Sequence, residues 1–219
     1  MQLVCITDLH GRLEALQRIL DDAGEPDAVL LGGDITNFGS PVDAVRVIQV
    51  IQQKAPNVLA VAGNCDSAAI DHRLDELGVA LHGRGLLCGS VGIHGLSAIP
   101  PWKHGMYQLT EEELEAALRT GYAAIQGARQ HVLLAHVPPR GMKVDRTFFC
   151  THAGSAALRS FIDRVQPGLV FCGHIHEGRG IEAVGKTTVV NCGFGGHGDY
   201  AVADVTDDAL HVTIRSARS

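Results

Sequence analysis

The sequence predicts one domain of the α/β class, because short apolar runs alternate with amphipathic stretches along the chain. Apolar runs of strand length occupy residues 3–7, 28–31, 58–61, 131–135 and 169–172. Between them, apolar residues recur at helical spacing in the stretches 13–23, 41–54, 110–126 and 155–165. A chain of 219 residues with 46% apolar residues can bury one sizeable core, and it shows no repeat or linker. We therefore expect residues 1–219 to form a single domain.

Local signals refine the boundaries of these elements. Gly24 is placed to end the first helix, and Thr110 with Glu113 forms the Thr-x-x-Glu pattern of a capping box at the start of the third. Residues 97–109 contain the pair Pro100-Pro101 and predict a long loop. Weaker strand signals occupy residues 79–81, 85–88, 91–96, 187–191, 200–205 and 209–214.

Composition and charge exclude several classes of protein. The formal net charge is -6 without a cluster of Lys or Arg, so we expect no duplex nucleic acid as a partner. No apolar run approaches the roughly 20 residues that span a bilayer, so we expect no membrane association. Because a strand-like run begins at Leu3 with no basic segment before it, we expect no signal peptide and a cytoplasmic protein. The six cysteines stand singly, which argues against a disulfide framework.

Polar residues of the metal-binding types directly follow five of the predicted strands. They are Asp8-Leu-His10, Gly33-Asp34, Gly63-Asn64-Cys65-Asp66, His136 and Gly173-His174-Ile-His176. In an open α/β sheet the carboxyl ends of the strands share one edge, so we expect these side chains to converge there. Asp8 and His10, at i and i+2 of an extended segment, should point the same way. The glycines in three of these motifs permit tight turns and a close approach of the backbone.

The chemistry of this set is that of a metal site. Asp and Asn supply oxygen and His supplies nitrogen, a mixture that suits Mn, Fe, Co, Ni or Zn better than Ca. Seven candidate ligands are too many for one tetrahedral ion and suit two ions that share a carboxylate. Each motif alone has a simpler interpretation: Gly33-Asp34 as a turn, His136 as a hydrogen-bonded core residue. The ordered combination after five strands favours metal binding.

These motifs resemble those of the calcineurin-like metallophosphoesterase superfamily, and most closely its small single-domain bacterial and archaeal phosphoesterases. The resemblance extends from Asp8 to the stretch 191–193 and includes the Gly154-Ser segment and residues 173–178. It implies a four-layer α/β/β/α sandwich, in which two mixed β-sheets are flanked by helices.

The resemblance also implies a role for each motif residue. One metal would be held by Asp8, His10 and His176, the other by Asn64, His136 and His174. Asp34 would bridge the two, with a bridging hydroxide opposite it as the nucleophile for in-line attack. The catalytic residues would be Asn64, Cys65, Asp66 and His136. Asn64 would lie near the phosphoryl oxygens, and Asp66 would orient its neighbours without touching metal.

One position departs from the pattern of the superfamily. Much of the superfamily has His after the Asn of the third motif, where it assists the leaving group, but this chain has Cys65. A thiol is a poorer proton donor than an imidazolium, so we favour diester substrates. Cys65 could equally be a small residue that leaves the site open. His104 and His152 are candidates to replace the missing histidine and to bind substrate, as is Asn37, with surface or core packing as the alternative.

The sequence thus predicts a dinuclear-metal-dependent phosphodiesterase that hydrolyses a small phosphodiester, for which a cyclic nucleotide is one candidate. Manganese is the expected metal, with Fe, Zn, Ni and Co as alternatives. Other enzymatic interpretations are a phosphomonoesterase or protein phosphatase and a nucleotide pyrophosphatase, whose larger relatives carry insertions that this chain lacks. A non-catalytic scaffold of the same fold would usually lack several ligands. A homo-oligomer is left open.

Overall fold

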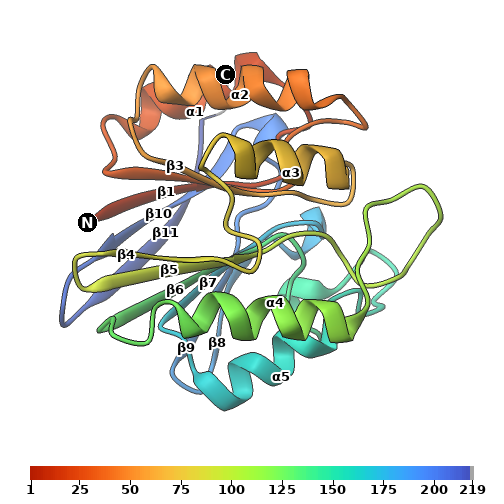
Figure 1. The fold of residues 1–219 in the computed structure, drawn as a ribbon, viewed down its shortest axis with the longest axis vertical. Helices are drawn as coiled ribbons and strands as arrows, with labels where there is room; N and C mark the ends of the chain where they lie inside the picture. The colour runs from red at the N-terminus through yellow and green to blue at the C-terminus, as the bar shows by residue number, and fades with distance from the viewer. Residues whose placement is uncertain (218–219) are drawn as a thin grey trace.

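Four layers make up the molecule, in the order helices, sheet, sheet, helices (Figure 1). The computed structural model describes residues 1–217. The expected α/β/β/α sandwich of two mixed sheets is confirmed. Within residues 1–217, no helix combines the length and the apolar character needed to cross a membrane.

The first sheet has five strands in the order β11-β10-β1-β2-β3. Its parallel strands are β1 (Gln2–Ile6), β2 (Ala28–Gly32) and β3 (Val58–Val61). The antiparallel strands β10 (Asp199–Val205) and β11 (Leu210–Ser216) extend it at the side of β1. Its outer face is covered by α1 (Leu13–Ala23), α2 (Pro41–Gln52) and α3 (Ala68–Glu76), the upper helices of Figure 1.

The second sheet has six strands in the order β4-β5-β6-β7-β9-β8. Four neighbours run parallel: β5 (Val91–Leu96), β6 (Gln130–Ala135), β7 (Leu169–Cys172) and β9 (Thr187–Asn191). The antiparallel strands β4 (Gly85–Cys88) and β8 (Gly180–Val184) form its edges. The helices α4 (Glu111–Ala123) and α5 (Ala156–Val165) cover its outer face.

The alternation of side chains along β1 shows how the layers are held together. Val4 and Ile6 pack into the apolar core under the first three helices, whereas Leu3 and Cys5 pack into the core between the sheets. Both faces of β1 are therefore buried, because successive residues of a strand point to opposite sides. This explains why the strand reads as a continuous apolar run in the sequence.

Helix starts follow the predicted capping chemistry. At α4, the Thr110 side chain accepts from the Glu113 backbone and the Glu113 carboxylate accepts from the Thr110 backbone, so the capping box is confirmed. Ser155 caps α5 by accepting from the backbone N–H of Leu158. The helix predicted over residues 110–126 is shorter than expected, because α4 ends at Ala123.

Some elements differ from the prediction. The helix α3, which buries only Ile70, Asp71 and Leu74 and so has little apolar periodicity, was not predicted, and neither was the edge strand β8. The strand expected at residues 79–81 is not a strand. Instead, Ala80 bridges to β3 of the first sheet and His82 bridges to β5 of the second, because the chain crosses from one sheet to the other at this point.

Candidate metal centre

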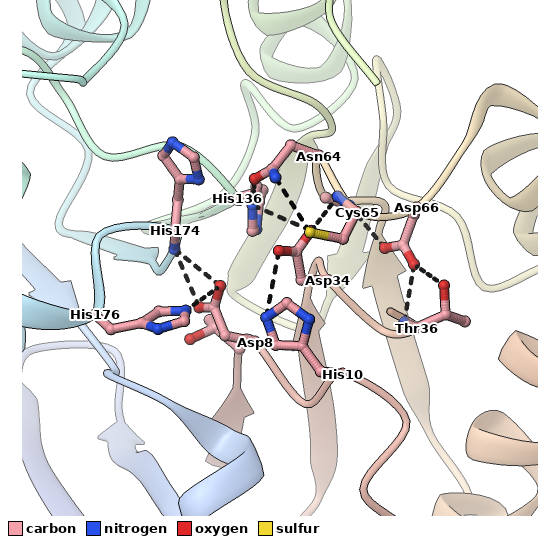
Figure 2. A network of polar contacts seen from close by, with 12 residues as sticks. Asp8, His10, Asp34, Thr36, Asn64, Cys65, Asp66, His136, His174 and His176 are labelled. Atoms are coloured by element: carbon pink, nitrogen blue, oxygen red, sulfur yellow. Dashed lines mark hydrogen bonds and ion pairs between the residues drawn. The ribbon is translucent and has the colours of Figure 1, made fainter. Parts of the chain in front are cut away.

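The five polar motifs meet at one end of the molecule, as the sequence predicted, although not at one sheet edge. Three of them follow β1, β2 and β3 of the first sheet, and two follow β6 and β7 of the second. Figure 2 shows labelled side chains from all five motifs gathered in one place. The site is therefore built from the edges of two facing sheets.

Three overlapping groups of side chains bring their ligand atoms within 4.8 Å of one another. These groups are Asp8 with His10 and His176, His10 with Asp34 and Cys65, and Asp8 with Asp34 and His136. Asp8, His10 and Asp34 each belong to two of the groups. Carboxylate oxygen together with imidazole nitrogen is a donor set that suits a divalent transition metal.

Asp8 is the buried centre of the first half of the site. Its side chain is 0% exposed, and its Oδ1 lies 3.2 Å from Nε2 of His176. Burial alone would raise the pKa of Asp8, but the hydrogen bond from His176 and the charge of His136 outweigh it and hold that pKa below its usual value. Burial opposes the charged form of His176 as well, yet Asp8 raises its pKa. The two groups stabilise each other's charge.

His136 is the corresponding residue of the second half. Its Nε2 lies 2.9 Å from Oδ1 of Asn64 and 3.5 Å from Oδ1 of Asp34. Its Nδ1 lies 3.0 Å from the carbonyl oxygen of Gly32. A ring nitrogen anchored on a backbone carbonyl fixes the orientation of an imidazole and leaves the other nitrogen for a metal. His10 contributes from the opposite side, with Nε2 3.5 Å from Oδ2 of Asp34.

His174 lies beside the centre without joining any of the three groups. Its ring centroid is 5.3 Å from that of His136, and its backbone N–H lies 3.0 and 3.2 Å from the two carboxylate oxygens of Asp8. Its Nε2 is buried with no hydrogen-bond partner among the described residues. Burial and the neighbouring His136 lower the pKa of His174 to about 3, which leaves the neutral imidazole that binds metals. An orphaned, neutral ring nitrogen fits the predicted role of a metal ligand.

The backbone at these positions is unusual. Asp8, His10, Asp34 and His174 all have positive φ angles, of 54°, 49°, 46° and 64°. The expectation that Asp8 and His10 belong to an extended segment was therefore wrong, because β1 ends at Ile6. The segment is held instead by hydrogen bonds from the N–H groups of Asp8 and His10 to the carbonyls of Gly33 and Asp34, at 3.0 and 2.8 Å. Such strained conformations of non-glycine residues concentrate at functional sites.

Glycines make the close approach between motifs feasible. A Cβ atom on Gly63 would lie 2.2 Å from Oδ1 of Asp34, and one on Gly173 would lie 2.1 Å from Oδ2 of Asp8. Both distances are far inside van der Waals contact. Gly63 and Gly173 are therefore required because a carboxylate of a different motif occupies the space of their missing side chain.

Cys65 and Asp66 hold the second and third motifs together. The backbone N–H of Cys65 donates to Oδ1 of Asp34 at 2.7 Å. Asp66 accepts hydrogen bonds from the N–H groups of Ile35, Thr36 and Gly63 at 2.8 to 3.0 Å. Asp66 belongs to none of the three groups of candidate ligands. Its contacts fix the loop after β2 against the loop after β3, and thereby the position of Asp34.

The candidate substrate-binding residues are placed differently from one another. Asn37 and His104 are exposed, the first shortly after Asp34 and the second in the loop before α4. His152 is bonded to Asp145 and lines a cavity together with Trp102.

Two aromatic neighbours of the centre were not predicted from the sequence. Phe194 stacks on His176 with ring centroids 4.6 Å apart, and Trp102 packs edge-on against His174 at 5.4 Å. Trp102 is the single tryptophan of the chain, and Phe194 lies in the glycine-rich run 193–198. Neither of these sequence features places Trp102 or Phe194 near the motifs, because the contacts join distant parts of the chain.

Fold and centre together define a class of enzyme, and comparison with known proteins agrees with it. The model of the calcineurin-like phosphoesterase family matches residues 1–178. An uncharacterized protein of Methanocaldococcus jannaschii is 31% identical over 198 residues, which cover 87% of each chain. The chain is a metal-dependent hydrolase of phosphoric esters. It belongs to the calcineurin-like phosphoesterase family.

Two further similarities concern named enzymes. Phosphodiesterase YfcE of Escherichia coli is 34% identical over 76 residues, which cover 31% of this chain and 41% of that protein. The crystal structure of a dimetal phosphatase from Danio rerio superposes with a TM-score of 0.64 at 13% identity, over 99% of this chain and 96% of that one. The second similarity shows a common fold.

Proposed function

We propose that the chain is a phosphodiesterase that hydrolyses a small phosphodiester with two divalent cations. The observation that carries this proposal is the overlap of the three ligand groups at Asp8, His10 and Asp34. A single cation would need only one set of ligands, whereas sets that share carboxylates and an imidazole provide for two neighbouring ions. The pairing of a buried carboxylate with imidazoles in each half supports the same arrangement.

In this proposal the first cation is held by Asp8, His10 and His176, the second by Asn64, His136 and His174, and Asp34 is common to both. When bound, the cations would activate a water molecule and neutralise charge on the phosphoryl oxygens. The protein contributes the rest. Asn64 presents an amide at the phosphoryl side, and Asp66 keeps the loop of Asp34 in register with that of Asn64.

Manganese is the proposed metal, with Fe, Zn, Ni and Co as alternatives. The donors are carboxylate and amide oxygens together with imidazole nitrogens, a mixed set that borderline transition metals accept. The position of Cys65 within 4.8 Å of the ligand atoms of His10 and Asp34 adds a soft donor to the neighbourhood.

Three observations support a diester over a monoester. Cys65 stands where a histidine would assist the leaving group, and its side chain is only 8% exposed. Burial, followed by the charge of Asp34, raises the pKa of its thiol, so it is a poor proton donor. The relative from Escherichia coli is named a phosphodiesterase. We further propose a cytoplasmic protein with a small phosphate ester as its partner, since a net charge of -6 disfavours duplex nucleic acid.

The proposal is tested by metal analysis of the purified protein and by parallel assays of bis(p-nitrophenyl) phosphate and p-nitrophenyl phosphate with added Mn²⁺. We expect two equivalents of metal and faster turnover of the diester. Faster turnover of the monoester would reject the diester preference and favour a phosphomonoesterase. Absence of both bound metal and Mn²⁺-dependent turnover would favour a non-catalytic scaffold.

A further inference from the structure

A cavity of about 270 Å³ lies between the segment that precedes α4 and the loop between β6 and α5. The first segment lines it with Ile99 to Trp102, and the loop lines it with Arg140 and residues 151–154. In Figure 1 these are the yellow-green loop before α4 and the green-to-teal loop before α5. We call it the Trp102 cavity. An indole, a guanidinium and an imidazole in its wall suit a substituent of a small substrate.

Trp102 is the wall that this cavity shares with the metal centre. Its ring lies edge-on to that of His174, with centroids 5.4 Å apart and an interplanar angle of 85°. The side chain is 60% exposed, so the indole also offers free surface to the solvent side. Trp102 therefore borders both His174 and the cavity.

His152 is held in this cavity by a buried carboxylate. Its Nδ1 lies 2.6 Å from Oδ1 of Asp145, which is 0% exposed. Asp145 also accepts from the backbone N–H groups of Gly141, Met142 and Gly154, at 3.0 to 3.2 Å. The carboxylate is thus fixed by the loop itself. Nε2 of His152 has no hydrogen-bond partner among the described residues, and its side chain is 40% exposed.

This arrangement is suited to proton donation. A carboxylate on one ring nitrogen fixes the orientation of an imidazole and compensates its positive charge, while the other nitrogen faces the reacting group. Two other charged groups line the cavity, Arg140 and Glu111. The Glu111 carboxylate is engaged, because it accepts from Oγ of Ser155 and from two backbone N–H groups at the start of α5. It therefore does not compete with Asp145 for His152.

The metal centre has no histidine to spare for this task. Its histidines are the four predicted ligands, and the position after Asn64 holds a cysteine. The cavity whose wall includes Trp102 holds an imidazole, that of His152, with a carboxylate on its Nδ1. The two features adjoin: the centre gathers the candidate metal ligands, and the cavity carries His152 on a buried carboxylate.

We propose that the Trp102 cavity receives the leaving group and that His152 is the catalytic residue that protonates it, with Asp145 as its positioning residue. This inference rests on the proposed phosphodiesterase function. As the oxygen of a water molecule bonds to phosphorus, the bond from phosphorus to the leaving oxygen breaks. The proton on Nε2 of His152 moves to that oxygen, which departs as an alcohol. The imidazole is then reprotonated by the proton that the attacking water releases.

The test compares two diesters that differ in the acidity of the leaving group, bis(p-nitrophenyl) phosphate and diphenyl phosphate. p-Nitrophenolate leaves without a proton, whereas phenolate gains much more from protonation. We expect His152→Gln to lower kcat for diphenyl phosphate by roughly 10²- to 10⁴-fold and to change kcat for the nitrophenyl ester much less. The matched control is His72→Gln on the exposed face of α3, which should change neither rate.

The outcomes separate this inference from the proposed function. Equal losses on both esters in His152→Gln, with an unchanged melting temperature, would mean a merely structural role and would overturn the assignment. An unchanged ratio with no loss at all would overturn it as well. If the wild type with Mn²⁺ hydrolysed neither diester, the proposed function would fail, and the inference with it.

The location of the leaving group has a separate readout that needs no turnover. Trp102 is the single tryptophan, so its fluorescence reports occupancy of the cavity. Diphenylphosphinate carries the same two rings on carbon–phosphorus bonds that the enzyme does not cleave. We expect it to shift the Trp102 fluorescence of the wild type and of His152→Gln with similar Kd. Inhibition without any change in fluorescence would place the leaving group elsewhere.

Discussion

Two histidines of the second sheet are equally buried and have opposite surroundings. His136, directly after β6, and His94, in the neighbouring β5, are both 0% exposed. Both nitrogens of His136 contact oxygen atoms, of Gly32 and Asn64, whereas neither nitrogen of His94 has a hydrogen-bond partner among the described residues. His94 is packed against the ring of Phe161 at 5.5 Å instead.

The titration behaviour of the two histidines follows from these surroundings. Burial disfavours the charged form of both. At His136 the carboxylates of Asp34 and Asp8 outweigh burial and raise its pKa. At His94 burial acts unopposed, and together with the neighbouring His131 it lowers the pKa to about 3. Equal burial therefore shifts the pKa of a histidine in either direction, depending on the charged groups that face it.

Asp34→Asn should have the largest effect on the candidate metal centre around His136. The substitution removes the carboxylate charge that belongs to two of the ligand groups and faces both His10 and His136. Because such a site supplies several kcal/mol of charge stabilisation, we expect kcat/KM for bis(p-nitrophenyl) phosphate to fall on the order of a thousand-fold. Bound metal should fall in parallel. Asp163→Asn on the exposed side of α5 is the control, and a metal content equal in both variants would contradict the shared role of Asp34.

The substitutions His136→Leu and His94→Leu compare the two histidines directly. His136→Leu leaves Asp34 and Asp8 buried without their partner charge, so the metal-free chain should lose about 3 kcal/mol of unfolding free energy. Urea unfolding in the presence of a chelator measures this loss. Unchanged stability would show that the carboxylates do not depend on His136.

His94 should make the stability of the chain depend on pH. Its folded pKa of about 3 lies below the ordinary value of 6.5, so the unfolded chain takes up this proton first as the pH falls. The stabilisation is present above pH 6.5 and is lost toward pH 3, by about 1.4 kcal/mol per pH unit. Between pH 8 and pH 5, wild type should lose about 2 kcal/mol more than His94→Leu. Parallel stability curves for the two proteins would contradict this.

At neutral pH the same His94→Leu variant should have a small effect of the opposite sign to His136→Leu. Replacing an imidazole with unpaired nitrogens by an apolar side chain of similar size removes a desolvation cost, so we expect a gain of about 1 kcal/mol. Urea unfolding at pH 8 measures it. A loss of stability instead would contradict the desolvation cost assigned to His94.

The sequence by itself determined the alternation of strands and helices, the residues of the five motifs and their place after strands. These features are local. The apolar run of β1 and the capping box of α4 are each encoded within a few neighbouring residues. The motif residues follow from them, because a polar group directly after a buried strand must lie at the edge of the sheet.

Only the tertiary structure decided how these pieces combine. It divided the motifs between two facing sheets and turned the backbone of Asp8 and His10 to positive φ. It also left both ring nitrogens of His94 without a hydrogen-bond partner within residues 1–217. It also placed His152 on Asp145 and beside Trp102. Each of these outcomes depends on residues from distant segments filling the same space. A pattern read along the chain records which side chains are available, whereas distances between segments arise only when the layers pack.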